Sequence, residues 1–151
     1  MIKGVDHVGI TVSNLDRALD FYCGRLGLRL IDREVVADAD IADLVGYDGA
    51  ELDCADLDSG DGRILELMEY RVPDGIPMHR EGRQSGNVHV SLNVGDLEAV
   101  LKQLADADAS MISRRVVRFD APGSPWHEVE CFYVSDPDGV VIELVSRPPQ
   151  H

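Results

Sequence analysis

One stretch of this chain occurs twice, and that repetition constrains the fold more than any other feature of the sequence. The segment HVGITVSNLDRAL begins at His7, and HVSLNVGDLEAVL, with the same order of apolar and polar residues, begins at His89. A second match follows later in each half, where DGRILEL begins at Asp61 and DGVVIEL begins at Asp138. Two motifs repeated in the same order predict that the chain consists of two copies of one structural module.

Within each copy the residue pattern changes its period. Residues 7–12 and 89–94 alternate apolar with polar or small residues, which is typical of a strand. Asn14 and Asp96 then occupy N-cap positions before residues with helical spacing, and Gly27 is expected to end the first helix. Further β-branched and apolar stretches, separated by turns, predict strands at 29–36, 51–57, 63–70, 111–119, 129–134 and 140–145.

Each copy is therefore predicted to fold as βαβββ. The fold class is α+β, with two tandem modules that form a curved mixed sheet and helices on its outer face. We expect a single domain over 1–151, with module one at about 1–70, a linker at about 71–86 and module two at about 87–147. A short extra helix is expected at 38–47.

Composition and charge exclude several functional classes. The chain carries 28 acidic against 14 basic side chains, and its net charge of −14 would repel nucleic acid. It has no signal-peptide pattern and no apolar run of about 20 residues, so we expect a cytoplasmic protein without a membrane partner. The three cysteines, Cys23, Cys54 and Cys131, have no CxxC spacing and are expected to be packed thiols.

Strand alternation places four polar side chains on one face of the predicted sheet. In the first strand the helix covers the face of Val8, Ile10 and Val12, so His7 points to the opposite face. In the last strand of module one, Leu65 and Leu67 lie on the helix side, and Glu66 therefore lies on the other. The same alternation puts His89 and Glu143 on the equivalent face of module two.

Charge balance favours a divalent metal ion at these side chains if the two modules join. Two carboxylates in a semi-enclosed sheet would repel each other and resist burial. A divalent cation cancels both charges, and neutral imidazoles add nitrogen ligands without adding charge. Mixed nitrogen and oxygen ligands suit Ni, Zn, Co, Mn or Fe. The predicted ligands are His7, Glu66, His89 and Glu143, with no site for an organic cofactor.

Other charged residues have simpler interpretations. Glu69 is expected to face solvent. Four arginines are candidates for holding an anionic substrate, although a solvated surface also explains them; they are Arg33, Arg71, Arg80 and Arg83.

The motifs DHVGITVSNLDRALDFYCGRLGL at 6–28 and DPDGVVIEL at 136–144 resemble the vicinal oxygen chelate superfamily. That family includes lactoylglutathione lyases (glyoxalases), methylmalonyl-CoA epimerases, extradiol dioxygenases and fosfomycin or bleomycin resistance proteins. The resemblance implies metal ligands at the four positions already selected, a small-molecule substrate and a homodimer. The metal site would form within one chain or across two.

A complete His, Glu, His, Glu set resembles the lyase and isomerase/epimerase branch of the family. The resemblance implies that the metal binds two substrate oxygens and stabilises an enediolate, with Glu66 or Glu143 as the catalytic base. The chain departs from individual members. Bacterial glyoxalases commonly carry a glutathione-contacting arginine where this chain has Thr11, and epimerases often have paired histidines where it has Val88 before His89.

Two other branches remain as alternatives. The stretch HEVECFYVSDPDGVVIE at 127–143 resembles extradiol dioxygenases, although His127 lies slightly too close to Tyr133 for their pattern. Their ferrous site needs two histidines and one carboxylate, so Glu66 as a fourth ligand argues against this branch. Resistance proteins bind a drug without metal or catalysis, and four intact ligand positions argue against that alternative too.

Overall fold

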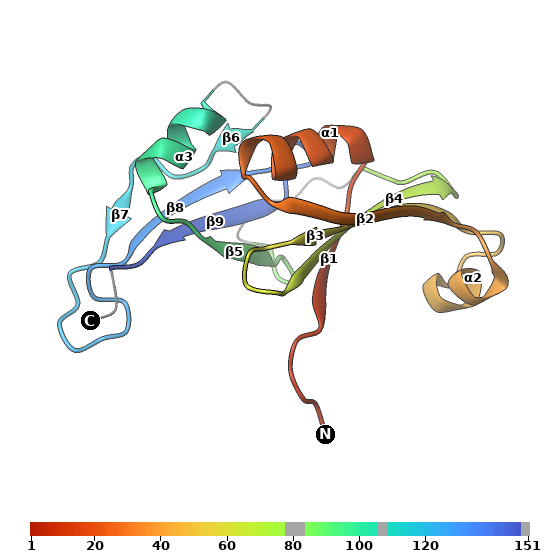
Figure 1. Cartoon of the computed structure of the whole chain (residues 1–151), viewed down its shortest axis with the longest axis horizontal. Coiled ribbons are helices and arrows are strands. Elements are labelled where there is room, and N and C mark those ends of the chain that lie inside the picture. Colours follow the sequence, from red (N-terminus) through yellow and green to blue (C-terminus); the bar gives the residue numbers. More distant parts are fainter. Residues whose placement is uncertain (78–83, 106–108, 149–151) are drawn as a thin grey trace. The chain divides into compact units, whose positions relative to one another are not determined.

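The computed structural model describes residues 1–77, 84–105 and 109–148 (Figure 1). The chain divides into two compact units, Met1–Met78 and His79–His151, and each is described here by itself. The division falls inside the linker predicted at 71–86. Each unit contains its own mixed sheet with a helix against it, so the predicted α+β class and the duplicated module are confirmed.

The first unit contains the four strands expected of a βαβββ module. Its sheet has the order β1-β4-β3-β2, with β1 parallel to β4 and the other neighbours antiparallel. The elements are β1 (His7–Thr11), α1 (Leu15–Leu19), the π-helix η1 (Asp20–Arg25), β2 (Arg29–Val36), α2 (Ala39–Val45), β3 (Glu51–Asp58) and β4 (Ile64–Val72). The expected extra helix is α2, none of whose residues is buried.

Helix α1 packs on the sheet of the first unit over β3 and β4 (Figure 1). Its start is fixed as predicted, because the Asn14 side chain accepts a hydrogen bond from the Arg17 amide at 2.8 Å. Leu15 and Ala18 are buried against the sheet. Glu69 was expected to face solvent. It is instead half-buried and accepts a hydrogen bond from the Leu15 amide at 2.6 Å. It thereby satisfies one of the free amides at the helix start.

The second unit repeats this arrangement. Its sheet has the order β5-β9-β8-β6, β7 also pairs with β8, and β5 is parallel to β9. The elements are β5 (His89–Asn93), α3 (Leu97–Leu104), β6 (Ser110–Met111), β7 (Val117–Arg118), β8 (Glu130–Ser135) and β9 (Val141–Ser146). Asp96 caps α3 as predicted, by accepting from the Ala99 amide at 2.9 Å. No helix in the described ranges is long and apolar enough to cross a bilayer.

The prediction of one continuous strand at 111–119 is wrong. This segment forms two short strands, β6 and β7, with residues 112–116 between them. The amides of Ile112 and Ser113 both donate to the Tyr133 carbonyl, at 2.9 and 3.0 Å, as in a bulge. The Ser113 hydroxyl also accepts from the Tyr133 amide at 2.8 Å. This side-chain bond replaces a ladder bond and interrupts the strand.

Candidate metal centre

The predicted faces of the strands are confirmed in both units. In β4, Leu65 and Leu67 are buried on the face of the sheet that the helix covers, and Glu66 between them lies on the opposite face. In β9, Ile142 and Leu144 are buried and flank Glu143 in the same way. Val8 is an exception in β1, since it is exposed although Ile10 is buried.

His7 and Glu66 form a close pair in the first unit. The distance from His7 Nε2 to Glu66 Oε2 is 3.6 Å, and 27% of the glutamate side chain is exposed. The other ring nitrogen, Nδ1, lies 3.0 Å from Asp6 Oδ2. The hydrogen bond to Asp6 raises the pKa of His7, against the lowering effect of burial. A proton held on Nδ1 leaves the lone pair of Nε2 beside the Glu66 carboxylate, as metal-binding histidines require.

His89 and Glu143 form the matching pair in the second unit. The distance from His89 Nε2 to Glu143 Oε2 is again 3.6 Å, and only 12% of the Glu143 side chain is exposed. The hydroxyls of Ser91 and Tyr133 both share hydrogen bonds with the Glu143 carboxylate. Burial first, and then the charge of Glu143, raises the pKa of Tyr133. Glu143 is therefore held in place from two sides.

The two pairs differ in the residues that face each glutamate. Gly9 is the register partner of Glu66, and Ser91 is that of Glu143. A Cβ atom at Gly9 would lie 2.9 Å from Met68 Cε and 3.4 Å from Glu66 Oε2. Glycine at this position leaves room for both side chains. In the second unit the serine at the same position binds the carboxylate instead.

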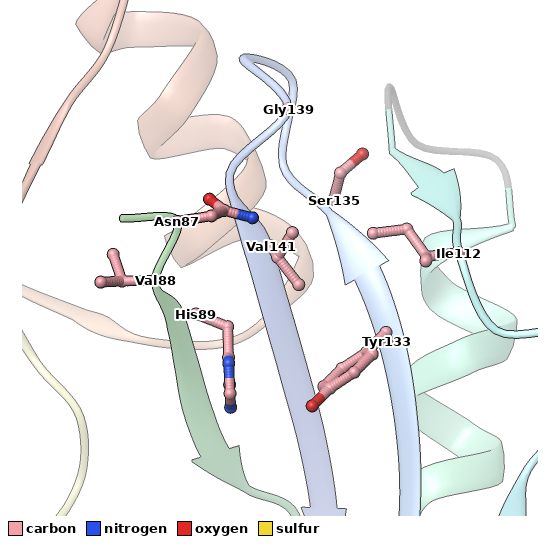
Figure 2. A pocket seen from close by; sticks show the side chains of 8 residues that line it. All are labelled: Asn87, Val88, His89, Ile112, Tyr133, Ser135, Gly139 and Val141. Carbon is pink, nitrogen blue, oxygen red and sulfur yellow. The ribbon is translucent and has the colours of Figure 1, made fainter. Parts of the chain in front are cut away.

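A pocket of about 480 Å³ opens beside His89 within the second unit (Figure 2). Figure 2 shows the His89 and Tyr133 side chains on the same side of the sheet, and their ring centroids are 5.4 Å apart. The lining of this pocket includes the polar side chains of Asn87 and Ser135 and the apolar side chains of Val88, Ile112 and Val141. The volume of the pocket is that of a small-molecule site.

Sequence reasoning missed Ser91, Asn87 and Ser135 as residues around the site. For Ser91 a signal was present, because it replaces Gly9 at the position of the repeat that faces the glutamate. Asn87 and Ser135 line the pocket at strand ends, and no motif marks them.

The donor atoms in each unit fit a divalent metal ion. Each pair offers one imidazole nitrogen and one carboxylate oxygen, which are common ligands of zinc, nickel and ferrous iron. Within either unit, the described residues hold no group of three or more His, Cys, Asp or Glu side chains suited to a metal. Each unit supplies one pair, and the four-ligand site stays a prediction.

Two of the arginines considered as substrate anchors are engaged elsewhere. Arg33 makes two hydrogen bonds to the buried Asp53, Nε to Oδ1 at 3.1 Å and Nη2 to Oδ2 at 2.9 Å. Arg71 pairs with the same carboxylate. Hydrogen bonding to Arg33, and then to Arg71, holds the pKa of Asp53 below its usual range despite burial. The other two candidates, Arg80 and Arg83, lie outside the described residues.

Comparison with known proteins connects this chain to a large superfamily. Residues 4–144 match the profile described as the glyoxalase/bleomycin resistance protein/dioxygenase superfamily. A probable lactoylglutathione lyase of Synechocystis sp. is 28% identical over 140 residues, covering 93% of this chain and 92% of the relative. A 2-epi-5-epi-valiolone epimerase of Actinomyces sp. is 27% identical over 150 residues, covering 95% of this chain and 79% of the relative.

The fold also matches solved structures. A glyoxalase family protein from Bacillus cereus superposes with a TM-score of 0.84 at 23% sequence identity, over 97% of this chain and 95% of that chain. At this level of identity the likeness establishes the architecture alone.

Proposed function

The chain belongs to the glyoxalase/bleomycin resistance protein/dioxygenase superfamily, and from this premise we propose that it is a divalent-metal-dependent lyase or isomerase/epimerase. Its substrate would be a small molecule with two neighbouring oxygen atoms. The observation that carries this proposal is the occurrence of two matched pairs, each with an imidazole nitrogen 3.6 Å from a carboxylate oxygen. The names of the two relatives support an enzyme of this superfamily.

Four side chains would hold the metal ion, namely His7, Glu66, His89 and Glu143. Their two negative charges would balance a divalent cation, and the neutral imidazoles would complete a mixed nitrogen and oxygen set. The bound cation would supply Lewis acidity toward the negative charge that develops on the substrate oxygens. The pairs would come from one chain, or from two chains of a homodimer.

The protein's own groups would carry the proton. A carboxylate oxygen of Glu66 or Glu143 would take it from the carbon next to the substrate carbonyl and return it to a neighbouring carbon or to the opposite face. The hydroxyls of Ser91 and Tyr133 fix the orientation of the Glu143 carboxylate. Asn87 and Ser135 in the pocket beside His89 would bind the polar part of the substrate.

Metal analysis tests the ligand set directly. Each of the variants His7→Ala, Glu66→Gln, His89→Ala and Glu143→Gln is expected to lose stoichiometric metal, because each removes one donor of a shared site. His127→Ala is the matched control, since His127 lies in the loop between β7 and β8 with Nδ1 3.8 Å from Asp120 Oδ1. Full metal content in all four ligand variants would contradict the proposal.

The metal present and the reaction catalysed separate this function from its alternatives. Solvent deuterium incorporation into methylglyoxal hemithioacetals or 2-methylmalonyl-CoA would report proton abstraction. Bound iron with cleavage of catechols would instead indicate the dioxygenase, which the resemblance of residues 127–143 makes the second candidate. Weakly held metal with no turnover would indicate a binding protein.

A further inference from the structure

We propose that Asp6 is a positioning residue of the candidate metal centre, because its carboxylate fixes the ring proton and the ring orientation of His7. This inference rests on the proposed function, in which Nε2 of His7 binds the metal ion. It adds to that function a residue that acts through a ligand and does not itself bind the ion.

The place of Asp6 just before a strand allows this contact. Successive residues inside a strand point to opposite faces of the sheet, so their side chains do not meet. Strand β1 begins at His7, and Asp6 therefore lies outside the pleated part of the chain. Its side chain turns back to the imidazole, with Oδ2 3.0 Å from Nδ1 of His7.

The charge of Asp6 determines which atom donates in this hydrogen bond. An ionised carboxylate has no proton and can only accept, so the proton must lie on Nδ1 of His7. In a neutral imidazole the other nitrogen, Nε2, is then without a proton and presents its lone pair. Histidines that bind metal ions usually hold their second ring nitrogen in this way.

The distance between His7 and Glu66 agrees with this protonation. Nε2 of His7 and Oε2 of Glu66 are 3.6 Å apart, which is longer than the hydrogen bonds between nitrogen and oxygen in proteins. Nε2 is therefore not needed as a donor to the carboxylate. Each of the two atoms can instead offer a lone pair to a shared cation.

The second unit has a different residue at the position of Asp6. The repeat places Val88 immediately before His89, and β5 begins at His89 as β1 begins at His7. A valine side chain has no acceptor atom, so it cannot hold the ring proton of His89. The contact between Asp6 and His7 is therefore a property of one unit and not of the repeated module.

The two units also differ in the contacts of their glutamates. Ser91 and Tyr133 share hydrogen bonds with Glu143 in the second unit. In the first unit Gly9, which has no side chain to offer, is the register partner of Glu66. The contacts that orient a ligand thus fall on the histidine in the first unit and on the glutamate in the second.

Zinc affinity, measured by competition with a chromogenic chelator, is the first test. Asp6→Val gives the first unit the residue of the second and should lower the affinity about tenfold, the low end of the usual range, because the Asp6 side chain is exposed. Asp6→Asn keeps an oxygen that accepts from Nδ1 and should stay within about threefold of the wild type. Asp74→Val, at an exposed aspartate after β4, is the control for the loss of one negative charge.

A spectroscopic signature distinguishes positioning from a merely structural role. The nitrogen chemical shifts of the His7 ring in the metal-free protein report which ring nitrogen carries the proton, at about pH 8.5, where imidazole is neutral. We expect the proton on Nδ1 in the wild type and in Asp6→Asn, and a shift of the proton population toward Nε2 in Asp6→Val. The spectrum of His7→Ala identifies the His7 signals. Thermal unfolding should stay at the wild-type temperature, since Asp6 is exposed.

The outcomes separate this inference from the proposed function. His7 shifts unchanged by Asp6→Val, or a zinc affinity equal in Asp6→Val and Asp74→Val, would overturn the inference while the function stands. An equal loss in Asp6→Asn and Asp6→Val would also overturn it, because charge and not the acceptor would then be the cause. Failure of the proposed function would appear as full metal content in the four ligand variants, although the proton on His7 would still depend on Asp6.

Discussion

At the scale of single residues, the surroundings of the two glutamates differ although the glutamates themselves match. Glu143 is held by Ser91 and Tyr133, while Glu66 faces Gly9 and is more exposed. Removing a group that orients a metal ligand typically weakens metal binding about tenfold to hundredfold.

Removing the serine hydroxyl should therefore weaken metal binding without removing a ligand. We expect Ser91→Gly, which gives the second unit the residue of the first, to lower metal affinity about tenfold or more. Competition with a chromogenic chelator measures this. Ser110→Gly, an exposed serine in β6, is the control and should match the wild type. Equal affinity in both variants would show that the Ser91 contact has no role in binding.

How far the sequence predicts the site also depends on particular residues. His7, Glu66, His89 and Glu143 were predicted because repetition and strand alternation mark them twice, and the structure pairs them two by two. Ser91 was not found as a site residue, although the repeat aligns it with Gly9, because its role depends on its lying opposite Glu143 in the neighbouring strand. That register is set by pairing across the sheet, which the repeat does not specify.

At the scale of elements, one buried carboxylate ties three strands of the first unit together. Asp53 in β3, only 1% exposed, binds Arg33 from β2 and Arg71 from β4. Arg33 also reaches Asp16 in α1, with Nη1 2.6 Å from Oδ1. These arginines are better explained as supports of the sheet than as substrate anchors.

We expect Asp53→Asn to lower the free energy of unfolding by about 2 kcal/mol, since it leaves partly exposed arginines without their carboxylate. Because the folded pKa of Asp53 is lowered, the stabilisation is fully present above the unfolded pKa of about 4 and is lost as the pH falls through the folded value. Urea unfolding at pH 7 and pH 3 should thus show a smaller difference between variant and wild type at pH 3.

Asp16→Asn is the control for that measurement, because it removes the other carboxylate that binds Arg33. Its side chain is mostly exposed, so we expect less than about 1 kcal/mol. An equal loss in both variants would contradict the structural role of the buried carboxylate.

The elements themselves were largely predictable. The positions of β1 to β5, β8 and β9 and the caps at Asn14 and Asp96 follow local rules of alternation and capping. The break between β6 and β7 was not predictable, because it depends on the hydrogen bond between Ser113 and Tyr133, twenty residues apart in sequence. Nor does helical spacing distinguish the π-helical turns of η1 from an ordinary helix.

At the scale of the whole molecule, the proposed site needs one pair from each unit. Mixing two inactive variants reveals whether both pairs come from the same chain. If a homodimer builds each site from two chains, combined His7→Ala and His89→Ala chains regain one intact site in each mixed dimer. If each chain builds its own site, mixing restores none. Metal content after joint refolding distinguishes the arrangements, with refolded single variants as the baseline.

The small space at Gly9 has a consequence for the division of labour between the two carboxylates. Two carboxylates related by an exact two-fold rotation would be equivalent bases, and neither would be preferred for proton transfer. Glycine facing one and serine facing the other removes that equivalence. One carboxylate should then accept the proton more readily than the other.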